Sequence, residues 1–282
     1  MNILLFGNVV RDIKIFVDNY PEQNTENRAD NIETTIGGNV ANTANVLAQL
    51  GHNVTWAGAL PENTDGHTIE NQLQNQNIKT QVHWLPSDTQ LPTSYVIISQ
   101  RTGSRTILHH RNMPEYDAAW FNCELISTPE WVHFESRNIE QQVKICNRLN
   151  TLFDTFKISV EVEKNRPGYE NILTLADTII YSHDFVLGCG FDDPKKFLTQ
   201  KACGKTTFLG WGSKGAAAID SKGKYVWQDA NDIDVVETLG AGDVFNAGII
   251  HNYHLSNLDL ILREARLLAE KKCTQTGFEK LA

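Results

Sequence analysis

Apolar residues of this chain occur in two kinds of segment that take turns along the sequence: short continuous runs, and stretches with helical spacing. Residues 3–10 form an apolar run with the length of a buried strand. Residues 41–50 carry Ala or Leu at helical spacing and are followed by Gly51, where a C-cap glycine belongs. Near the end, Ser256-Asn257-Leu258-Asp259 supplies a capping box for a helix over 258–272.

The same patterns predict the remaining elements of the chain. Further strands are expected at 54–60, 131–134, 158–162, 178–181, 206–210, 215–219 and 225–227, and further helices at 66–75, 139–153, 194–203 and 245–253. Strands that alternate with helices form a mostly parallel sheet covered by helices. The chain is therefore expected to adopt an α/β fold.

Two segments interrupt this alternation. Residues 32–36 alternate with period two, which is typical of a strand exposed on one side. The apolar stretches 94–98 and 106–108 flank a turn at 102–104 and predict a hairpin. We expect these segments to pair into a small separate sheet, over residues 12–36 and 91–110. The large domain then comprises residues 1–11, 37–90 and 111–282.

Composition is that of an ordinary globular protein, with 282 residues of which 41% are hydrophobic and 21% charged. A net charge of −9 without a dense Lys/Arg stripe argues against nucleic acid or an anionic membrane as a partner. No stretch approaches the roughly 20 apolar residues of a membrane span. The five scattered cysteines predict free thiols in a reducing compartment, so we expect a cytoplasmic protein.

Gly240-Ala241-Gly242-Asp243 is the first candidate for chemistry. Two glycines before a helix leave backbone N–H groups free to converge on an anion, and the helix dipole adds positive charge. Beside a bound γ-phosphate, the carboxylate of Asp243 could take the proton from an attacking hydroxyl. An aspartate in the first turn is also a plain helix stabiliser, so the pattern alone leaves a capped turn open.

Polar residues elsewhere could bind a small hydroxylated ligand. In Gly37-Gly38-Asn39-x-x-Asn42, the two amides lie one turn apart at a helix start, where they could contact sugar hydroxyls. A glycine turn with an Asn cap explains the same pattern. Asp12 could also bind hydroxyls, and Arg105 could meet phosphate, but each by itself is equally typical of a turn or a solvated side chain.

Other catalytic patterns are absent from the sequence or lack the right context. Gly210-Trp211-Gly212-Ser213-Lys214-Gly215 fits the dinucleotide fingerprint G-x-G-x-x-G, but a short apolar segment and another turn follow it where a helix is required. No G-x-x-x-x-G-K-[ST] sequence occurs, which excludes a P-loop, and no H-E-x-x-H spacing suggests catalytic zinc.

Taken together, these residues resemble the ribokinase-like (PfkB) carbohydrate kinases. Gly37-Gly38 looks like the N-terminal signature of that family, and Glu237-Thr238-Leu239-Gly240-Ala241-Gly242-Asp243 looks like its C-terminal signature, D-T-x-G-A-G-D. Within the family the likeness is greatest to the ketohexokinases (fructokinases) and covers nearly the whole chain. It is carried by Asp18-Asn19-Tyr20-Pro21, Arg105-Thr106-Ile107, and residues 131–138, 160–164, 235–247, 271–273 and 277–278.

The resemblance implies a ribokinase-like three-layer α/β/α domain and a β-sheet lid that is often shared between two subunits, hence a homodimer through the lid. It also implies that Asp243 is the base and that the amides of Gly240, Ala241 and Gly242 form an anion hole. The sugar would be held by Asp12, Gly38, Asn39, Asn42 and Arg105. The nucleotide would lie near Trp211, Gly212, Gly215, Phe245 and Cys273.

The sequence departs from the family pattern at three places. Glu237 replaces the usual Asp and is one methylene longer, which leaves open whether a monovalent cation such as K⁺ binds at this loop. Asn24 stands where ketohexokinases carry an acid that reaches the partner's sugar. The N-x-x-E metal motif has no clear match; Glu161 and Glu163 could both orient Mg²⁺ through water, and the sequence does not choose between them.

The expected activity is ATP- and Mg²⁺-dependent phosphorylation of a ketose such as fructose, giving the 1-phosphate. Two alternatives stay open: a related kinase acting on ribose, a nucleoside or a keto-deoxy sugar acid, and a catalytically silent sugar- or nucleotide-binding protein. A sugar acid would need more cationic groups near Asn39 than Arg105 alone. The intact Gly-Ala-Gly-Asp243 sequence argues against a silent protein.

Overall fold

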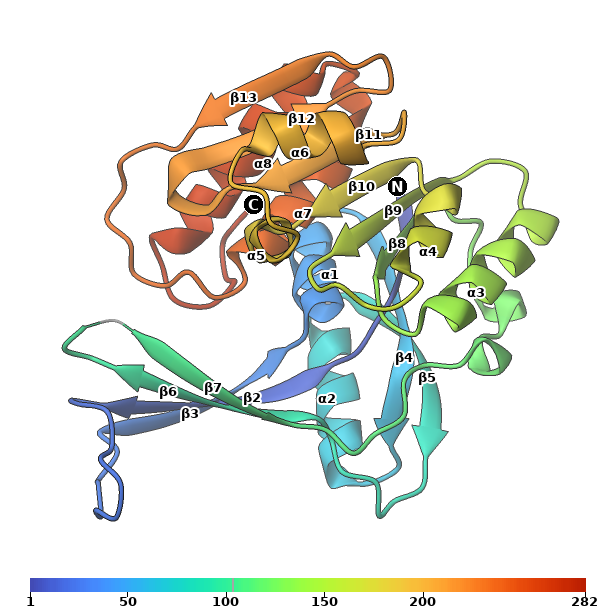
Figure 1. The fold of residues 1–282 in the computed structure, drawn as a ribbon. Coiled ribbons are helices and arrows are strands. Elements are labelled where there is room, and N and C mark those ends of the chain that lie inside the picture. The colour runs from blue at the N-terminus through green and yellow to red at the C-terminus, as the bar shows by residue number, and fades with distance from the viewer. Residues whose placement is uncertain (103) are drawn as a thin grey trace.

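The computed structural model describes residues 1–102 and 104–282. Within these residues the chain forms a nine-stranded sheet and a four-stranded sheet (Figure 1). The large sheet has the order β13-β12-β11-β10-β9-β8-β1-β4-β5 and the small sheet the order β3-β2-β6-β7.

The strands of the large sheet are β1 (Asn2–Phe6), β4 (Asn53–Pro61), β5 (Ile78–Leu85), β8 (Trp131–Glu135), β9 (Lys157–Val162), β10 (Thr178–Tyr181), β11 (Thr206–Gly210), β12 (Gly215–Ile219) and β13 (Tyr225–Asp229). Those of the small sheet are β2 (Val10–Val17), β3 (Asn31–Gly37), β6 (Thr93–Ser99) and β7 (Arg105–His110). The α-helices are α1 (Asn39–Gln49), α2 (Thr64–Asn75), α3 (Ile139–Leu152), α4 (Tyr169–Leu175), α5 (His183–Gly188), α6 (Pro194–Lys201), α7 (Ala241–Asn252) and α8 (Leu258–Cys273).

The large sheet is the middle of three layers. Its strands from β5 across to β11 are parallel, and β12 and β13 complete one edge antiparallel. Alternate side chains of β1 enter opposite cores: Leu4 and Phe6 pack with α3 to α6, while Ile3 and Leu5 pack with α1, α2 and α7. The expected α/β/α fold with a mostly parallel sheet is confirmed.

The order of strands reverses at β1. From this strand the chain builds outward through β4 and β5 on one side, and later through β8 to β11 on the other. Ligands of open α/β sheets bind outside the carboxyl ends of the strands at such a switch point. Here Gly7 and Asn8 follow β1, and residues 136–138 follow β8.

The small sheet projects to one side of the large one (Figure 1). Residues that pair across neighbouring strands share a face, so its register separates two faces. On one face lie Asp12 of β2, Ser94 of β6 and His109 of β7. The other face carries an apolar stripe with three exposed members, Ile32, Tyr95 and Leu108.

One predicted strand was wrong. The apolar run 3–10 is split, because β1 ends at Phe6 and Val10 already begins β2 in the other sheet. Gly7 lies between them, packed so closely on Val40 that a Cβ would overlap that side chain. The sequence patterns also missed β5, α4 and α5, which are short or strongly polar, and Gly103 of the predicted turn lies outside the described residues.

Three further properties bear on the expectations from the sequence. All five cysteines are free. No helix among the described residues is long and apolar enough to cross a membrane. The helix predicted from residue 245 begins earlier, at Ala241, so Asp243 lies within its first turn.

Candidate active site

Asp243 and the glycine-rich segment before it form the start of α7. Gly240 caps this helix with φ 80°, and a Cβ there would overlap the ring of Phe278, so only glycine fits. The first N–H groups of a helix have no partner within it. Ala241 N donates to Thr238 O at 3.3 Å, which leaves the amides of Gly242 and Asp243 as the ones available to an anion.

Asp243 is buried among polar partners from α1. Asn42 Nδ2 donates to Asp243 Oδ2 at 2.7 Å, and Thr43 Oγ1 donates to the backbone oxygen of Asp243 at 3.2 Å. One turn earlier, Asn39 Nδ2 donates to Glu161 Oε2 at 3.1 Å and to Glu163 Oε2 at 3.3 Å. The amides at the start of α1 therefore contact Asp243 of α7 and two carboxylates at the end of β9.

Gly38 allows α1 to begin where it does. Its φ is 106°, and a Cβ on Gly38 would overlap the backbone oxygen of Asn8. Asp12 of β2 lies against the neighbouring glycine, because a Cβ on Gly37 would overlap the carboxylate of Asp12. The structure thus brings Asp12 to the Gly37–Asn42 segment, two places that only the family resemblance had grouped together.

Burial and mutual repulsion raise the pKa values of the carboxylates. For Asp243, burial and then the charge of Glu161 hold the pKa well above its ordinary value, while the hydrogen bond from Asn42 opposes this. Burial raises the pKa of Glu161 to about 7, with a smaller contribution from Glu163. A buried carboxylate with a raised pKa binds a proton more readily, which suits a general base.

A cleft of about 740 Å³ lies beside the start of α7. This volume is within the range of small-molecule sites. Its lining includes eight of the predicted residues: Arg105, Glu161, Gly212, Gly215, Ala241, Gly242, Phe245 and Cys273. Trp211 does not line it; this side chain is buried in the core, and its ring packs edge-on against His183.

The small sheet contacts the glycine-rich segment through two cations. Arg105 Nη1 of β7 donates to Thr238 Oγ1 at 2.7 Å, and Lys14 Nζ of β2 donates to Glu237 Oε1 at 2.6 Å. Sequence reasoning singled out Arg105 but missed Lys14. The only signal for Lys14 was its place in the small sheet.

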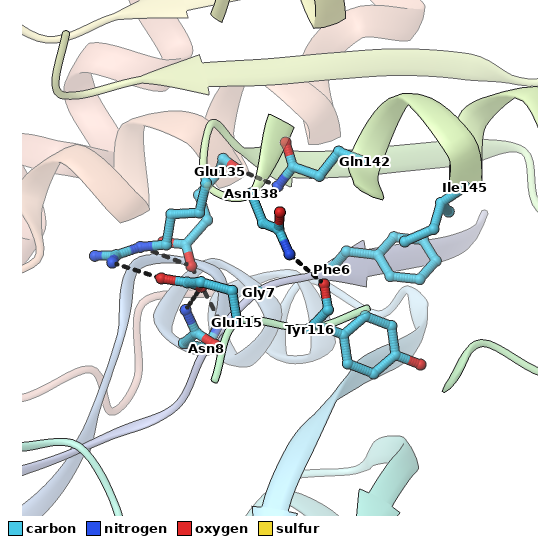
Figure 2. A pocket seen from close by; sticks show the side chains of 10 residues that line it. Phe6, Gly7, Asn8, Glu115, Tyr116, Glu135, Asn138, Gln142 and Ile145 are labelled. Atoms are coloured by element: carbon cyan, nitrogen blue, oxygen red, sulfur yellow. Dashed lines mark hydrogen bonds and ion pairs between the residues drawn. The ribbon is translucent and has the colours of Figure 1, made fainter. Parts of the chain in front are cut away.

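A polar cluster at the switch point was also missed (Figure 2). Glu135 Oε1 accepts a hydrogen bond from the backbone N–H of Asn8 at 3.0 Å and lies 3.2 Å from Arg137 Nε. Asn8 Nδ2 donates to Glu115 Oε2 at 2.7 Å, and the same carboxylate pairs with Arg111 at 3.0 Å. Residues 135–138 carried the family resemblance, but no role had been assigned to them.

Glu161 and Glu163 suit a metal that is bound mainly by its substrate. Both lie at the carboxyl end of β9 and share the amide of Asn39. Among the described residues, no three or more His, Cys, Asp or Glu side chains converge closely enough to hold a metal. Mg²⁺ commonly needs only one or two carboxylates in addition to water and substrate phosphates, so this pair fits it.

Comparisons with known proteins cover nearly the whole chain. The family model for pfkB family carbohydrate kinases matches residues 1–279. Mouse ketohexokinase is 32% identical over 98% of this chain and 97% of that protein. An ATP-dependent ribose-1-phosphate kinase from Halopiger xanaduensis is 23% identical over 89% and 84%. The adenosine kinase structure from Sinorhizobium meliloti, at 16% identity, superposes with a TM-score of 0.83 over 100% and 96%, which shows a shared fold.

Proposed function

The chain belongs to the pfkB family of carbohydrate kinases and is an ATP-dependent carbohydrate kinase; we propose that its acceptor is a ketose such as fructose, phosphorylated to the 1-phosphate. One observation carries the mechanism. The carboxylate of Asp243, oriented by Asn42 at 2.7 Å, lies in the same helical turn as the free amide of Gly242. A base and an anion-binding amide are therefore adjacent, as phosphoryl transfer requires.

In the proposed reaction, Asp243 takes the proton from the attacking hydroxyl. The amides of Gly242 and Asp243, with the dipole of α7, stabilise the charge on the transferred group, and Gly240 and Ala241 set the course of the loop. Asp12, Gly38, Asn39 and Asn42 bind the sugar hydroxyls. Bound Mg²⁺ would neutralise phosphate charge, and Glu161 and Glu163 would hold its water ligands.

The nucleotide is proposed to occupy the 740 Å³ cleft. Gly212, Gly215 and Phe245 line it, Phe245 with an aromatic ring, and so does Cys273 at the end of α8. Arg105 reaches the cleft from the small sheet, where it can meet phosphate. The position of Trp211 supports an indirect role, because its buried ring orients the segment that carries these glycines.

Residues 12–36 and 91–110 are proposed to act as a lid that excludes water when the sugar is bound. The apolar stripe on the outer face of this sheet supports a homodimer through the lid, because exposed Ile32, Tyr95 and Leu108 would be buried there. The five free cysteines support a reducing compartment such as the cytoplasm. A Leu108→Lys variant should be monomeric if the lid forms the interface.

A neutral sugar is favoured over an acidic or phosphorylated one. Arg137 lies 3.2 Å from Glu135 and 3.6 Å from Glu115, and Arg111 lies 3.0 Å from Glu115. These carboxylates pair with two arginines at the switch point, and Arg166 Nη1 of the same cluster donates to Ser136 O at 2.9 Å, so each guanidinium already has a partner within the protein. The 32% identity to mouse ketohexokinase supports a ketose in particular.

A coupled assay of ADP formation over a panel of sugars tests the proposal. Fructose and related ketoses should give the highest kcat/KM, and NMR of the product should place the phosphate at carbon 1. A preference for ribose, a nucleoside, ribose 1-phosphate or a keto-deoxy sugar acid would overturn the ketose assignment. Sugar and ATP binding without turnover would indicate the silent alternative.

A further inference from the structure

Lys272 is a fully buried cation beneath the glycine-rich segment. Its side chain is 0% exposed, and its Nζ donates to Glu237 Oε2 at 2.9 Å, Glu237 O at 3.3 Å and Gln275 O at 3.4 Å. Three acceptors match the three N–H bonds of an ammonium group. The Phe278 ring lies 5.4 Å away and adds a cation–π contact. Such partners are needed because a buried, unpaired ammonium is very unfavourable.

Glu237 joins this cation to two other parts of the molecule. Its second oxygen, Oε1, accepts from Lys14 Nζ of the small sheet at 2.6 Å, while Oε2 also accepts from Gly277 N at 2.9 Å. Burial by itself would raise the pKa of Glu237, but the hydrogen bonds from Lys14, Lys272 and Gly277 together hold it below the ordinary value. One carboxylate is thus shared by the lid, α8 and the C-terminal segment.

The same region sets the position of the anion-binding amides. Val236 N and Glu237 N both donate to Cys273 O, at 2.8 Å and 3.2 Å. Gly240 packs against Phe278, and α7 begins at the next residue. The backbone of residues 236–240 therefore packs against residues 272–278, and the side chain of Lys272 extends from the second segment to contact the first.

Backbone carbonyls and a carboxylate are ligands that a monovalent metal ion such as K⁺ would use. Here those oxygens already surround an ammonium, so the donor set does not fit an additional K⁺. We propose that Lys272 is a built-in cation that holds the anion-binding loop in place of a monovalent metal ion, and that Lys14 links the lid to the same carboxylate. The proposal rests on the proposed function, because it assigns Lys272 the positioning of that loop.

Wild-type protein gives the first test. The kcat for sugar phosphorylation and the Tm of the protein should be the same in KCl, NaCl and choline chloride at equal ionic strength. A ligand that binds the folded state raises the Tm, so a K⁺-specific rise in Tm or in kcat would overturn the proposal. The Tm comparison does not depend on catalysis, so it tests K⁺ binding even if no sugar is phosphorylated. Failure of this proposal can therefore be distinguished from failure of the kinase assignment.

Lys272→Ala gives the second test, since it opens space beside Glu237. Its kcat should fall by about 10- to 100-fold through misplacement of the loop, and K⁺ or methylammonium should restore part of both kcat and Tm. Lys272→Met, which removes the charge but fills the space, should show the loss without the rescue. Lys271→Ala is the matched control, because this exposed neighbour contacts Leu281 O instead. If Lys272→Ala keeps the wild-type kcat, or if Lys272→Met is rescued equally, the positioning role is wrong.

Lys14→Met provides a further test if the Lys272 variants do not fold, because Lys14 belongs to β2 of the small sheet and not to the core of the large domain. Loss of its contact with Glu237 should raise the KM for sugar more than it lowers kcat, since the lid loses its link to the loop. Lys14→Arg should recover most of the KM. An unchanged KM in Lys14→Met would overturn the link between lid and loop.

Discussion

The two acidic residues at the ends of the Glu237–Asp243 segment have opposite environments. The side chain of Glu237 is 14% exposed and receives hydrogen bonds from Lys14, Lys272 and the amide of Gly277. Asp243 is 7% exposed and has the Asn42 amide as its side-chain partner within the described structure, with Glu161 close enough to repel it. The pKa of Glu237 is lowered and that of Asp243 is raised.

Burial does not explain this difference, because both carboxylates are largely buried and burial raises both pKa values. The charges around them decide the outcome. Two lysines keep Glu237 ionised as a support for the loop, whereas neighbouring carboxylates leave Asp243 ready to accept a proton. Only the second environment suits a general base at neutral pH.

Asp243→Asn is the largest test of this contrast. Loss of the base should lower kcat by about 10²–10⁴-fold while the Kd for ATP is retained. Stability should move the other way. An acid with a raised folded-state pKa costs stability progressively as the pH rises above its unfolded-state pKa, and the full cost is reached above the folded-state pKa, so its removal should raise the Tm at neutral pH. If Asp243→Asn had a lower Tm and the wild-type kcat, Asp243 would support the fold and would not be the base.

Glu237→Gln should instead destabilise the protein, because it leaves Lys272 buried without a counter-charge. The expected loss in the free energy of unfolding is about 3–5 kcal/mol, measured by urea denaturation. Since the folded-state pKa of Glu237 is lowered, its contribution is present above the unfolded-state pKa and is lost as the pH falls through the folded-state pKa. The gap between wild type and variant should therefore narrow in acid; equal stability at neutral pH would contradict the supporting role.

Glu161→Gln should shift the pH dependence of the base. Removal of this negative charge lowers the pKa of Asp243, so the acid limb of the kcat/KM profile should move to lower pH. The pH at which the limb lies is the measured quantity. The maximal kcat/KM is not, because loss of a residue that holds magnesium would also lower it. Glu163→Gln, which removes a weaker repulsion, should move the limb less in the same direction. If the acid limb does not move in Glu161→Gln, the charge of Glu161 does not raise the pKa of Asp243.

Asn42→Ala should move the same limb the opposite way, by a smaller amount. The Asn42 amide stabilises the ionised form of Asp243, so its loss raises the pKa and shifts the limb to higher pH. Asn45→Ala is the control on the same helix, because Asn45 contacts Gln49 and not Asp243. Shifts of equal sign in Asn42→Ala and Glu161→Gln would contradict the electrostatic explanation.

Sequence patterns predicted those strands and turns whose structure is set by neighbouring residues in the chain. Apolar runs located most central strands, and the glycines of residues 37–42 and 240–243 marked both ends of the site before the structure joined them. The contacts around Glu237 had no such signal. Lys14 is 223 residues away from Glu237 and lies in no recognisable motif. Lys272 is 35 residues away and belongs to the segment 271–273 that carried the family resemblance, but that resemblance assigned no role to its ammonium group. Trp211 was placed near the nucleotide by the family resemblance, but its large apolar ring packs in the core.

The most direct measurement is the rate of phosphoryl transfer in a single turnover, with ATP already bound and the sugar at saturation. This isolates the chemical step from binding and product release. Asp243→Asn should be slower than wild type by about 10²–10⁴-fold, whereas folded Glu237→Gln should lose much less. A wild-type rate in Asp243→Asn would contradict the assignment of Asp243 as the base.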